Sequence, residues 1–340
     1  MSRETHEWLS NNTLIGFTEK RGNAWHYREG DSNHYTGAVP VEDVIKRLFS
    51  WTPQERPMFM GVQQADTGLW VPGKQIPGRK AITRSDTGDL LGMFGDGYRV
   101  HEYPEWLIEN VGTLLDTSTG DLGIGSAVLL RKGAVAAVQV EVPETFRSPE
   151  GLEFRPFVLA STSLDGSIAT SYGRNVTAVV CDNTLDMGLN ERGQKIKIRH
   201  TRNSLDGKVA MAREALQLIH TTADDFMAEI AKFSSVSVDD KQWEAIVFEL
   251  TKTEDNASKR SVTMASNKRD ALMQLWQNDD RVAPWRGTAL GAFQALNTYG
   301  THVQTVKGAE RPERNALNVV TGGQAKVDKQ ARELIMSLAA

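Results

Sequence analysis

Basic side chains gather in one segment of an otherwise slightly acidic chain. The 340 residues carry a formal net charge of −4, yet the run from Arg192 to Arg213, which comes soon after residues 179–185, is strongly cationic and contains a single acid, Asp206. A local cationic surface suits an anionic partner, and it indicates a nucleic-acid phosphate backbone. The members of this segment, counting its histidine, are Arg192, Lys195, Lys197, Arg199, His200, Arg202, Lys208 and Arg213.

Three of these cations have the spacing of one face of a strand. Lys195, Lys197 and Arg199 alternate with isoleucines, and residues two apart in a strand project to the same side. His200 and Arg202 extend the patch. The alternative interpretation is a solvated charged strand that acids elsewhere in the chain balance.

A second cationic group lies earlier in the chain, and aromatic residues near both groups could stack on bases. This group is Lys74, Arg79, Lys80 and Arg84, and the stacking candidates are Tyr98, Tyr172 and Trp70. We expect the residues that contact nucleic acid to be Lys195, Lys197, Arg199, His200, Arg202, Lys80, Arg84, Tyr172, Arg174 and Lys208.

The other motifs predict no catalytic, metal or cofactor site. The chain has no Gly-x-x-x-x-Gly-Lys-Ser/Thr phosphate loop, and its seven histidines include no i, i+4 pair of the kind found in zinc proteases. Cys181 follows two valines, which is typical of a small buried hydrophobe rather than a nucleophile. The enzymatic alternative is a hydrolase or nuclease that uses Cys181 or the loop set His26, Asp31 and His34.

The composition is that of a soluble globular protein. Hydrophobic residues make up 40% of the chain and charged residues 24%, and no apolar run approaches the roughly 20 residues that cross a bilayer. The first residues are polar and acidic, unlike a secretory signal. A single cysteine excludes an internal disulfide and agrees with a reducing compartment. We therefore expect a cytoplasmic protein without membrane contact.

Strand patterns come before residue 200 and helical patterns dominate after it. Short apolar runs between turn-forming residues predict strands at 58–62, 80–84, 90–94, 98–101, 126–131, 134–142, 154–161, 168–172, 177–180 and 195–200. Residues 85–89 and Lys132-Gly133 predict hairpin turns, and the Gly/Pro stretch with Lys74 and Arg79 and residues 308–312 predict loops. Apolar residues at helical spacing predict helices at 40–51, 103–115, 208–233, 239–250, 267–278, 287–299 and 325–340.

This order of elements predicts an α+β fold. We expect an antiparallel sheet of hairpins with helices packed on one face, followed by a mainly helical C-terminal region. The other face of the sheet is left for solvent or a partner. The expected divisions are an N-terminal extension at 1–36, an α+β core at 37–205, and a helical region packed on that core at 206–340.

Several short motifs along the chain are familiar as a set. The strongest is Val179-Val180-Cys181-Asp182-Asn183-Thr184-Leu185, followed by Ile198-Arg199-His200-Thr201 and a predicted helix. The others are Trp25-His26, Glu55-Arg56-Pro57, the hairpin Ala81-Ile82-Thr83-Arg84-Ser85-Asp86-Thr87-Gly88, Leu91-Gly92 and Gly97-Tyr98. Over roughly residues 20–230 the set resembles a phage- and plasmid-like family described as domain of unknown function 932.

The chain departs from the family pattern at one segment. The family commonly has a Glu-Thr-Ala-Gly-like stretch where this sequence reads Asp116-Thr117-Ser118-Thr119-Gly120. We therefore carry no functional role over to that segment.

The resemblance implies a phage or plasmid setting in a bacterial host cytoplasm. The order of helix, hairpin strands, helix and further strands is also similar to the core of phage single-strand annealing proteins, a likeness of fold alone. It implies a non-catalytic protein that binds single-stranded DNA along a basic groove in recombination or replication. Such a protein forms a homo-oligomeric ring or filament and can work beside a partner exonuclease. The remaining alternative is a structural or host-interaction protein whose basic strand docks on an acidic protein.

Overall fold

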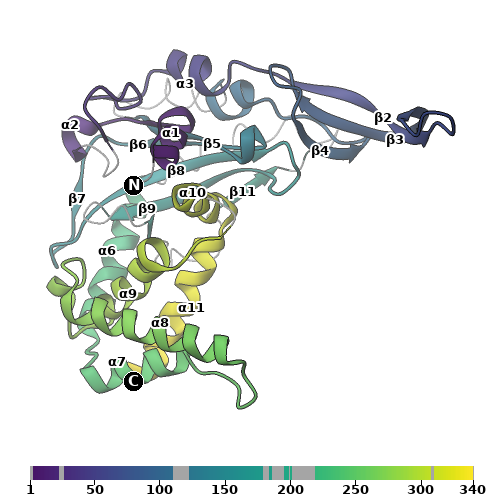
Figure 1. Cartoon of the computed structure of the whole chain (residues 1–340). Coiled ribbons are helices and arrows are strands. Elements are labelled where there is room, and N and C mark those ends of the chain that lie inside the picture. The colour runs from purple at the N-terminus through teal and green to yellow at the C-terminus, as the bar shows by residue number, and fades with distance from the viewer. Residues whose placement is uncertain are drawn as a thin grey trace. The chain divides into compact units, whose positions relative to one another are not determined.

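The computed structural model describes residues 3–22, 27–109, 122–178, 184–185, 195–198, 200, 219–307 and 310–339. As predicted, the fold is α+β, with antiparallel sheets in the N-terminal half and a mainly helical C-terminal region (Figure 1). Two compact units alternate along the sequence. Unit 1 comprises Met1–Pro143, Val158–Gly173 and Lys195–Gln217, and unit 2 comprises Glu144–Phe157, Arg174–Gln194 and Leu218–Ala340.

The larger sheet is built from antiparallel hairpins. Its strands follow the order β1 (Thr13–Ile15), β5 (Gly123–Leu130), β6 (Val135–Glu141), β8 (Glu153–Ser163), β9 (Thr170–Ala178) and β10 (Thr184–Leu185). Two shorter strands pair beside this path, with β7 (Phe146–Arg147) on β8 and β11 (Lys195–Ile198) on β9.

The hairpin of β5 and β6 shows how the sequence sets this sheet. Lys132 and Gly133 form the predicted turn with positive φ angles of 56° and 101°, and Leu130 pairs with Val135 directly after it. Consecutive residues of a strand point to opposite faces, yet the side chains from Val135 to Val138 are all buried. Neither face of the sheet is therefore left to solvent at β6.

A smaller sheet in unit 1 consists of β2 (Pro53–Gln63), β3 (Trp70–Arg84) and β4 (Leu90–Gly95). The β2–β3 hairpin (residues 53–84) is paired from Pro53 and Arg84 at its base to Gln63 and Trp70 at its tip. Because β4 pairs only with Arg79–Thr83, the distal part of the hairpin is a two-stranded ribbon. Figure 1 shows this ribbon extending away from the strands β5 and β6 of the same unit.

Short helices complete unit 1. These are α1 (Arg3–Asn12), α2 (Thr18–Arg21), α3 (Val41–Leu48) and the π-helix η1 (Pro104–Glu109), with the turn η2 (Arg131–Gly133) between β5 and β6. The apolar side of α3 buries Val44 and Leu48, and η1 buries Trp106 and Leu107. Burial of these side chains supplies the hydrophobic driving force that holds the helices on the unit.

Helices form the bulk of unit 2. They are α6 (Ile219–Ser235), α7 (Asp240–Leu250), α8 (Lys259–Asn278), η3 (Ala283–Trp285), α9 (Ala289–Thr298), η4 (Tyr299–Val303), α10 (Arg311–Thr321) and α11 (Gly323–Ala339). Their core includes a stacked pair, Trp243 and Trp276, with ring centroids 4.9 Å apart. The indole Nε1–H of Trp276 donates to Oδ1 of Asp240 at 2.8 Å, which satisfies the polar atom of a fully buried ring.

Most predicted elements of the described residues are present, and the errors have local causes. Residues 98–101 are irregular rather than a strand, because the turn after β4 continues through Tyr98. The segment 70–79, interpreted as a Gly/Pro loop, is the distal half of β3. The predicted loop at 308–312 gives way to α10 from Arg311, with Pro312 in its first turn, where proline is tolerated. Parts of the predicted helices at 103–115 and 208–233 lie outside the described residues.

The start of α7 offers a test of local stability. Asp239 is its N-cap: the Asp239 carboxylate accepts from the Gln242 N–H at 2.8 Å, and the Asp239 N–H donates to the Gln242 side chain at 2.9 Å. We expect Asp239→Ala to lower the free energy of unfolding by about 1 kcal/mol, whereas Asp239→Asn keeps the cap and changes it little. Urea denaturation followed by tryptophan fluorescence measures both, and equal losses would contradict the capping role.

Candidate functional site

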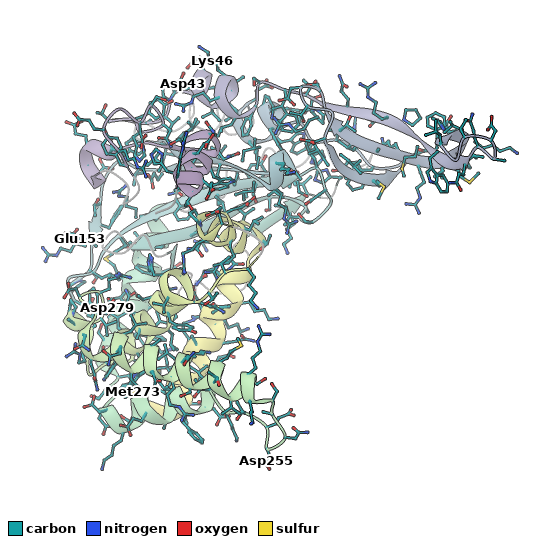
Figure 2. The ribbon with its side chains drawn as sticks, in the orientation of Figure 1. Asp43, Lys46, Glu153, Asp255, Met273 and Asp279 are labelled. Atoms are coloured by element: carbon teal, nitrogen blue, oxygen red, sulfur yellow. The ribbon has the colours of Figure 1, made fainter. Side chains whose placement is uncertain are left out.

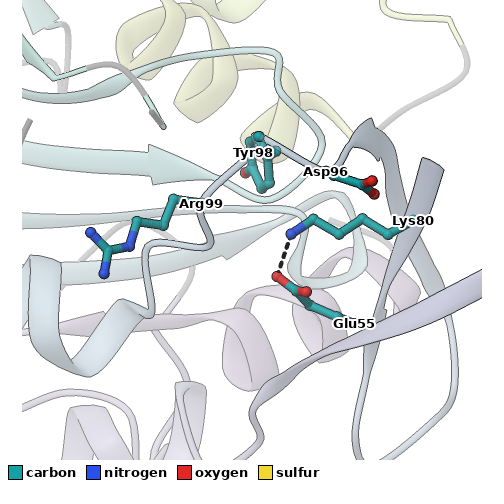
Figure 3. Close-up of a pocket in the computed structure, with 6 residues that line it drawn as sticks. Glu55, Lys80, Asp96, Tyr98 and Arg99 are labelled. Carbon is teal, nitrogen blue, oxygen red and sulfur yellow. Dashed lines mark hydrogen bonds and ion pairs between the residues drawn. The ribbon is translucent and has the colours of Figure 1, made fainter. Parts of the chain in front are cut away.

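A pocket of about 500 Å³ opens in unit 1 at the base of the β2–β3 hairpin. Its lining comes from three places: Glu55 on β2, Lys80 on β3, and the segment Asp96, Gly97, Tyr98 and Arg99 after β4 (Figure 3). Antiparallel pairing places Glu55 and Lys80 on neighbouring strands. The sheet therefore creates one wall of the pocket, and the chain leaving β4 creates the other.

The charges of this pocket are partly matched. The Lys80 ammonium donates to Oε1 of Glu55 at 2.6 Å, and the Lys80 side chain is 14% exposed. Figure 3 shows Lys80 reaching to Glu55 while the guanidinium of Arg99 points away from that pair. Lys80, which the sequence predicts as a phosphate contact, is therefore already held by a carboxylate.

A continuous column of five stacked rings adjoins the pocket. Phe94 stacks on Tyr98 with centroids 3.7 Å apart, and the far side of Tyr98 faces His200 at 5.0 Å. His200 in turn stacks on His101 at 3.9 Å, and His101 stacks on Trp106 at 3.8 Å. The column joins β4, the following loop, η1 and His200, which lies two residues after β11. It therefore fixes segments that are distant in sequence.

Hydrogen bonds fix the tautomer of the neutral His200 ring inside this column. Its Nδ1–H donates to the Arg99 carbonyl at 3.0 Å, which leaves Nε2 as an acceptor for the hydroxyls of Thr162 and Thr170, each at 3.3 Å. Burial lowers the pKa of His200 below its ordinary value, and the bond to Arg99 offsets part of that effect. His200 is therefore a neutral ring at pH 7, and the expectation that it neutralises a phosphate is corrected.

Tyr98 is held as a wall of the pocket rather than as a stacking platform. Its hydroxyl donates to the Ser163 carbonyl at 3.2 Å, and burial, with the Asp165 carboxylate adding to it, raises the pKa of Tyr98 above its ordinary value. Because Phe94 and His200 cover its two faces, a base cannot stack on it.

Tyr172 is also unavailable to a base. It is 2% exposed, and its hydroxyl donates to the Trp106 carbonyl at 2.6 Å. The expectation of a contact between Tyr172 and nucleic acid is therefore wrong for this fold. The sequence pattern places Tyr172 on a strand, but whether that face of the strand is covered depends on η1, which packs on it.

Two of the predicted arginines have structural partners. The Arg84 guanidinium lies 4.2 Å from the centroid of the Trp51 ring, binds Asp86 through two nitrogens at 2.9 and 2.7 Å, and donates to the Lys132 carbonyl at 2.9 Å. Arg174 in unit 2 donates to Thr222 at 3.3 Å and lies 3.9 Å from the Asp225 carboxylate. Both arginines connect elements of the protein, so neither guanidinium is free to bind an anionic ligand.

The basic strand itself is described in part. β11 pairs antiparallel with β9 from Lys195 opposite Gly173 to Ile198 opposite Thr170, as the alternating pattern predicts. Lys197 is exposed and Ile198 is buried, so the cationic and apolar faces are separated there. Arg199, Arg202, Lys208, Cys181 and the side chain of Lys195 lie outside the described residues.

The exposed end of the β2–β3 hairpin is a surface to which the sequence patterns gave little weight. Trp70 is 71% exposed and Phe59 48%, and Lys74 and Arg79 are exposed on β3. No residue that the structure describes forms an ion pair with Lys74 or Arg79. The sequence signal was the turn Asp66-Thr67-Gly68 between two apolar runs, the same triplet that was used to predict the turn before β4.

The predicted loop set for hydrolysis is described only in part. Asp31 accepts a hydrogen bond from Nε2 of His6 at 3.0 Å, whereas Nδ1 of His34 faces the side-chain oxygen of Asn33 at 2.9 Å, and His26 lies outside the described residues. Within the described ranges, no three His, Cys, Asp or Glu residues group as metal ligands would. The same residues include no helix that is both long and apolar enough to span a membrane.

The pKa of His200 can be tested directly. Because that pKa is lowered on folding, the neutral ring stabilises the protein fully above about pH 6.5, and this contribution is lost as pH falls from there through the folded-state pKa. We expect the His200 ring protons to titrate below about pH 6.5 in an NMR pH series. Tyr98→Ala, which opens one face of the ring to water, should move the pKa back upwards. A pKa at or above the ordinary value would contradict this account.

Comparison with known proteins supplies a family. Residues 90–321 match the family described as Domain of unknown function (DUF932), which covers the ring column, β5 to β11 and the helices up to α10. Comparison with curated proteins and with solved structures found no match. The match extends over well more than half of the 340 residues and includes the motifs from Leu91 onward, whereas Trp25-His26, Glu55-Arg56-Pro57 and the hairpin at 81–88 lie outside it. The chain belongs to the DUF932 family.

Proposed function

We propose that this protein binds single-stranded DNA without catalysing a reaction, and that it protects or anneals strands during phage- or plasmid-type recombination or replication. The observation that carries the proposal is the β2–β3 hairpin, where exposed cations without carboxylate partners lie on the same ribbon as an exposed aromatic ring. Cations for the backbone and a ring for the bases are the two parts of a general single-strand binding surface.

The charge of this hairpin suits an anionic ligand. Residues 53–84 contain five basic and two acidic residues, in a chain that is net acidic. Lys80 and Arg84 at the base are engaged by Glu55 and Asp86, and Arg56 donates to the Gln54 side chain, which leaves Lys74 and Arg79 for a ligand. An anionic strand gains from both charges without breaking an ion pair.

The basic strand at β11 supports the same proposal from another part of unit 1. Lys197 is exposed there, and among the described residues none forms an ion pair or a hydrogen bond with its side chain. In this proposal Lys195, Arg199, Arg202 and Lys208 add phosphate contacts beside it, as the alternating sequence pattern predicts. His200, Tyr172, Arg84 and Arg174 hold the fold instead.

Annealing requires that several copies share one strand. We infer a homo-oligomer, ring or filament, that spaces the strand along successive hairpins and leaves base edges open for pairing. A partner exonuclease that generates single strands fits this role. Two observations support this inference: the order of elements is similar to that of phage annealing proteins, and the hairpin exposes a suitable surface. Neither of them comes from the family match.

Binding to single-stranded DNA should show the salt dependence of phosphate neutralisation. We expect the logarithm of affinity to fall linearly with the logarithm of salt concentration, with a slope near −0.7 per phosphate contacted. Lys74→Ala combined with Arg79→Ala should make that slope shallower by about 1.4, since each cation removed spares about 0.7. Fluorescence anisotropy of a labelled oligonucleotide over a salt series measures this.

A matched control lies on α3 of the same unit. Lys46 is exposed there, outside the hairpin (Figure 2), so Lys46→Ala removes one positive charge from the protein but should leave the slope unchanged. A wild-type protein that fails to bind single-stranded DNA at low salt would refute the proposed function. If Lys46→Ala changed the slope by half as much as the double hairpin substitution, in proportion to the charge removed, net charge rather than the hairpin would drive binding.

A further inference from the structure

We propose that Trp70, seated on Gly61, is a nucleobase-stacking platform at the end of the β2–β3 hairpin. This inference rests on the proposed function and gives it a specific site. It assigns to the hairpin a contact with the base itself, whereas Lys74 and Arg79 contact the phosphates.

The geometry of the hairpin presents one face of the indole to solvent. Trp70 pairs with Gln63 across the ribbon, and Gly61 lies two residues further along β2 on the same face. A Cβ added at Gly61 would lie 3.1 Å from Cε3 and 3.5 Å from Cζ3 of Trp70. The indole therefore rests directly over Gly61, where even a Cβ would require it to shift by a few tenths of an ångström, and its other side is open, since the residue is 71% exposed.

The ring faces of the other candidates are occupied. Phe94 and His200 cover Tyr98, Tyr172 is buried, and Arg269 lies 5.4 Å from the centroid of the exposed ring of Phe248 in unit 2. Among the described residues, no ring or cation contact is found for Trp70. Of the aromatic residues that the sequence suggested for stacking, Trp70 thus retains a free face.

Exposed apolar residues lie near Trp70 on both faces of the hairpin. Figure 2 shows side chains projecting on both sides of this ribbon. The exposed side chains are Phe59, Met60, Val62, Leu69 and Trp70, and an apolar group of this kind usually marks a binding surface. The occupant must also match the charge of the hairpin, which has five basic and two acidic residues.

Charge decides between the occupants. Two β2–β3 hairpins from two copies of this chain would bring like charges together, which disfavours pairing of one hairpin with the other. A single strand of nucleic acid supplies both matching parts, because its phosphates are anionic and its bases have apolar faces that stack on tryptophan. We therefore commit to an unpaired base of single-stranded DNA as the ligand of Trp70.

The test separates base contacts from phosphate contacts. Binding of the full-length protein is compared between an oligothymidylate and a base-free deoxyribose-phosphate chain of the same length. We expect the wild type to prefer the base-bearing chain by about 5- to 150-fold, the range expected for one stacked base. Trp70→Ala should abolish most of that preference and leave the salt slope unchanged, and Trp70→Phe should keep part of it.

Gly61→Val and Lys74→Ala complete the design. Gly61→Val keeps the tryptophan but displaces its ring from its seat, so the base preference should fall while the salt slope stays the same. Lys74→Ala should do the reverse, with a shallower slope and an unchanged preference. Circular dichroism of each variant confirms that the fold is retained, as expected for side chains at an exposed tip.

Each remaining outcome is decisive. A wild type that binds both chains equally, or a preference that survives Trp70→Ala, overturns the platform and leaves the proposed function standing. A wild type that binds neither chain refutes the proposed function and the platform together. If Trp70→Ala instead dissociates an oligomer in the absence of DNA, by size-exclusion chromatography with light scattering, the hairpin is a protein interface and the platform is wrong.

Discussion

The contacts of Arg84 hold the base of the β2–β3 hairpin, and the exposed surface of this protein depends on that anchor. An isolated two-stranded hairpin is marginally stable in water. The Arg84 guanidinium lies over the Trp51 ring, binds Asp86 and donates to the carbonyl of Lys132 in the turn between β5 and β6. One side chain thus joins the hairpin to the end of α3 and to the larger sheet. The distal ribbon can be exposed because its base is fixed by several directional contacts.

The ring column provides the second anchor and explains why a histidine serves it. Phe94 belongs to β4 and stacks on Tyr98, which in turn stacks on His200. These contacts tie the small sheet to the region around β11. A protonated imidazole in this column would present donors on both nitrogens, and Nε2 faces hydroxyl groups that also bond to each other and to His101. The neutral ring instead donates at Nδ1 and accepts at Nε2, which satisfies both sides. Stacking and hydrogen bonding therefore select the same protonation state.

Local patterns predicted much of this fold, and their failures are failures of tertiary context. The alternation at residues 195–198 correctly predicts the strand β11, and the Lys132-Gly133 turn lies where its composition places it. Burial of Tyr172 and His200 could not be predicted in this way, because each is covered by residues far away in sequence, such as Trp106 and Tyr98. Trp70 was named as a stacking candidate, yet its strand was interpreted as a loop, since Pro72, Gly73 and Pro77 obscured the β pattern.

Ion pairing divides the cations of the hairpin into two groups, and this division locates the surface that a ligand can use. Lys80 is largely buried against Glu55, and Arg84 against Asp86, with side chains 14% exposed in each case. A phosphate that recruited either cation would leave a carboxylate unpaired beside a second negative charge, at a cost of desolvation and repulsion. Lys74 and Arg79 carry no such penalty, because no described carboxylate competes for them. An anionic strand should therefore follow the outer part of the hairpin, towards Trp70, rather than enter the pocket at its base.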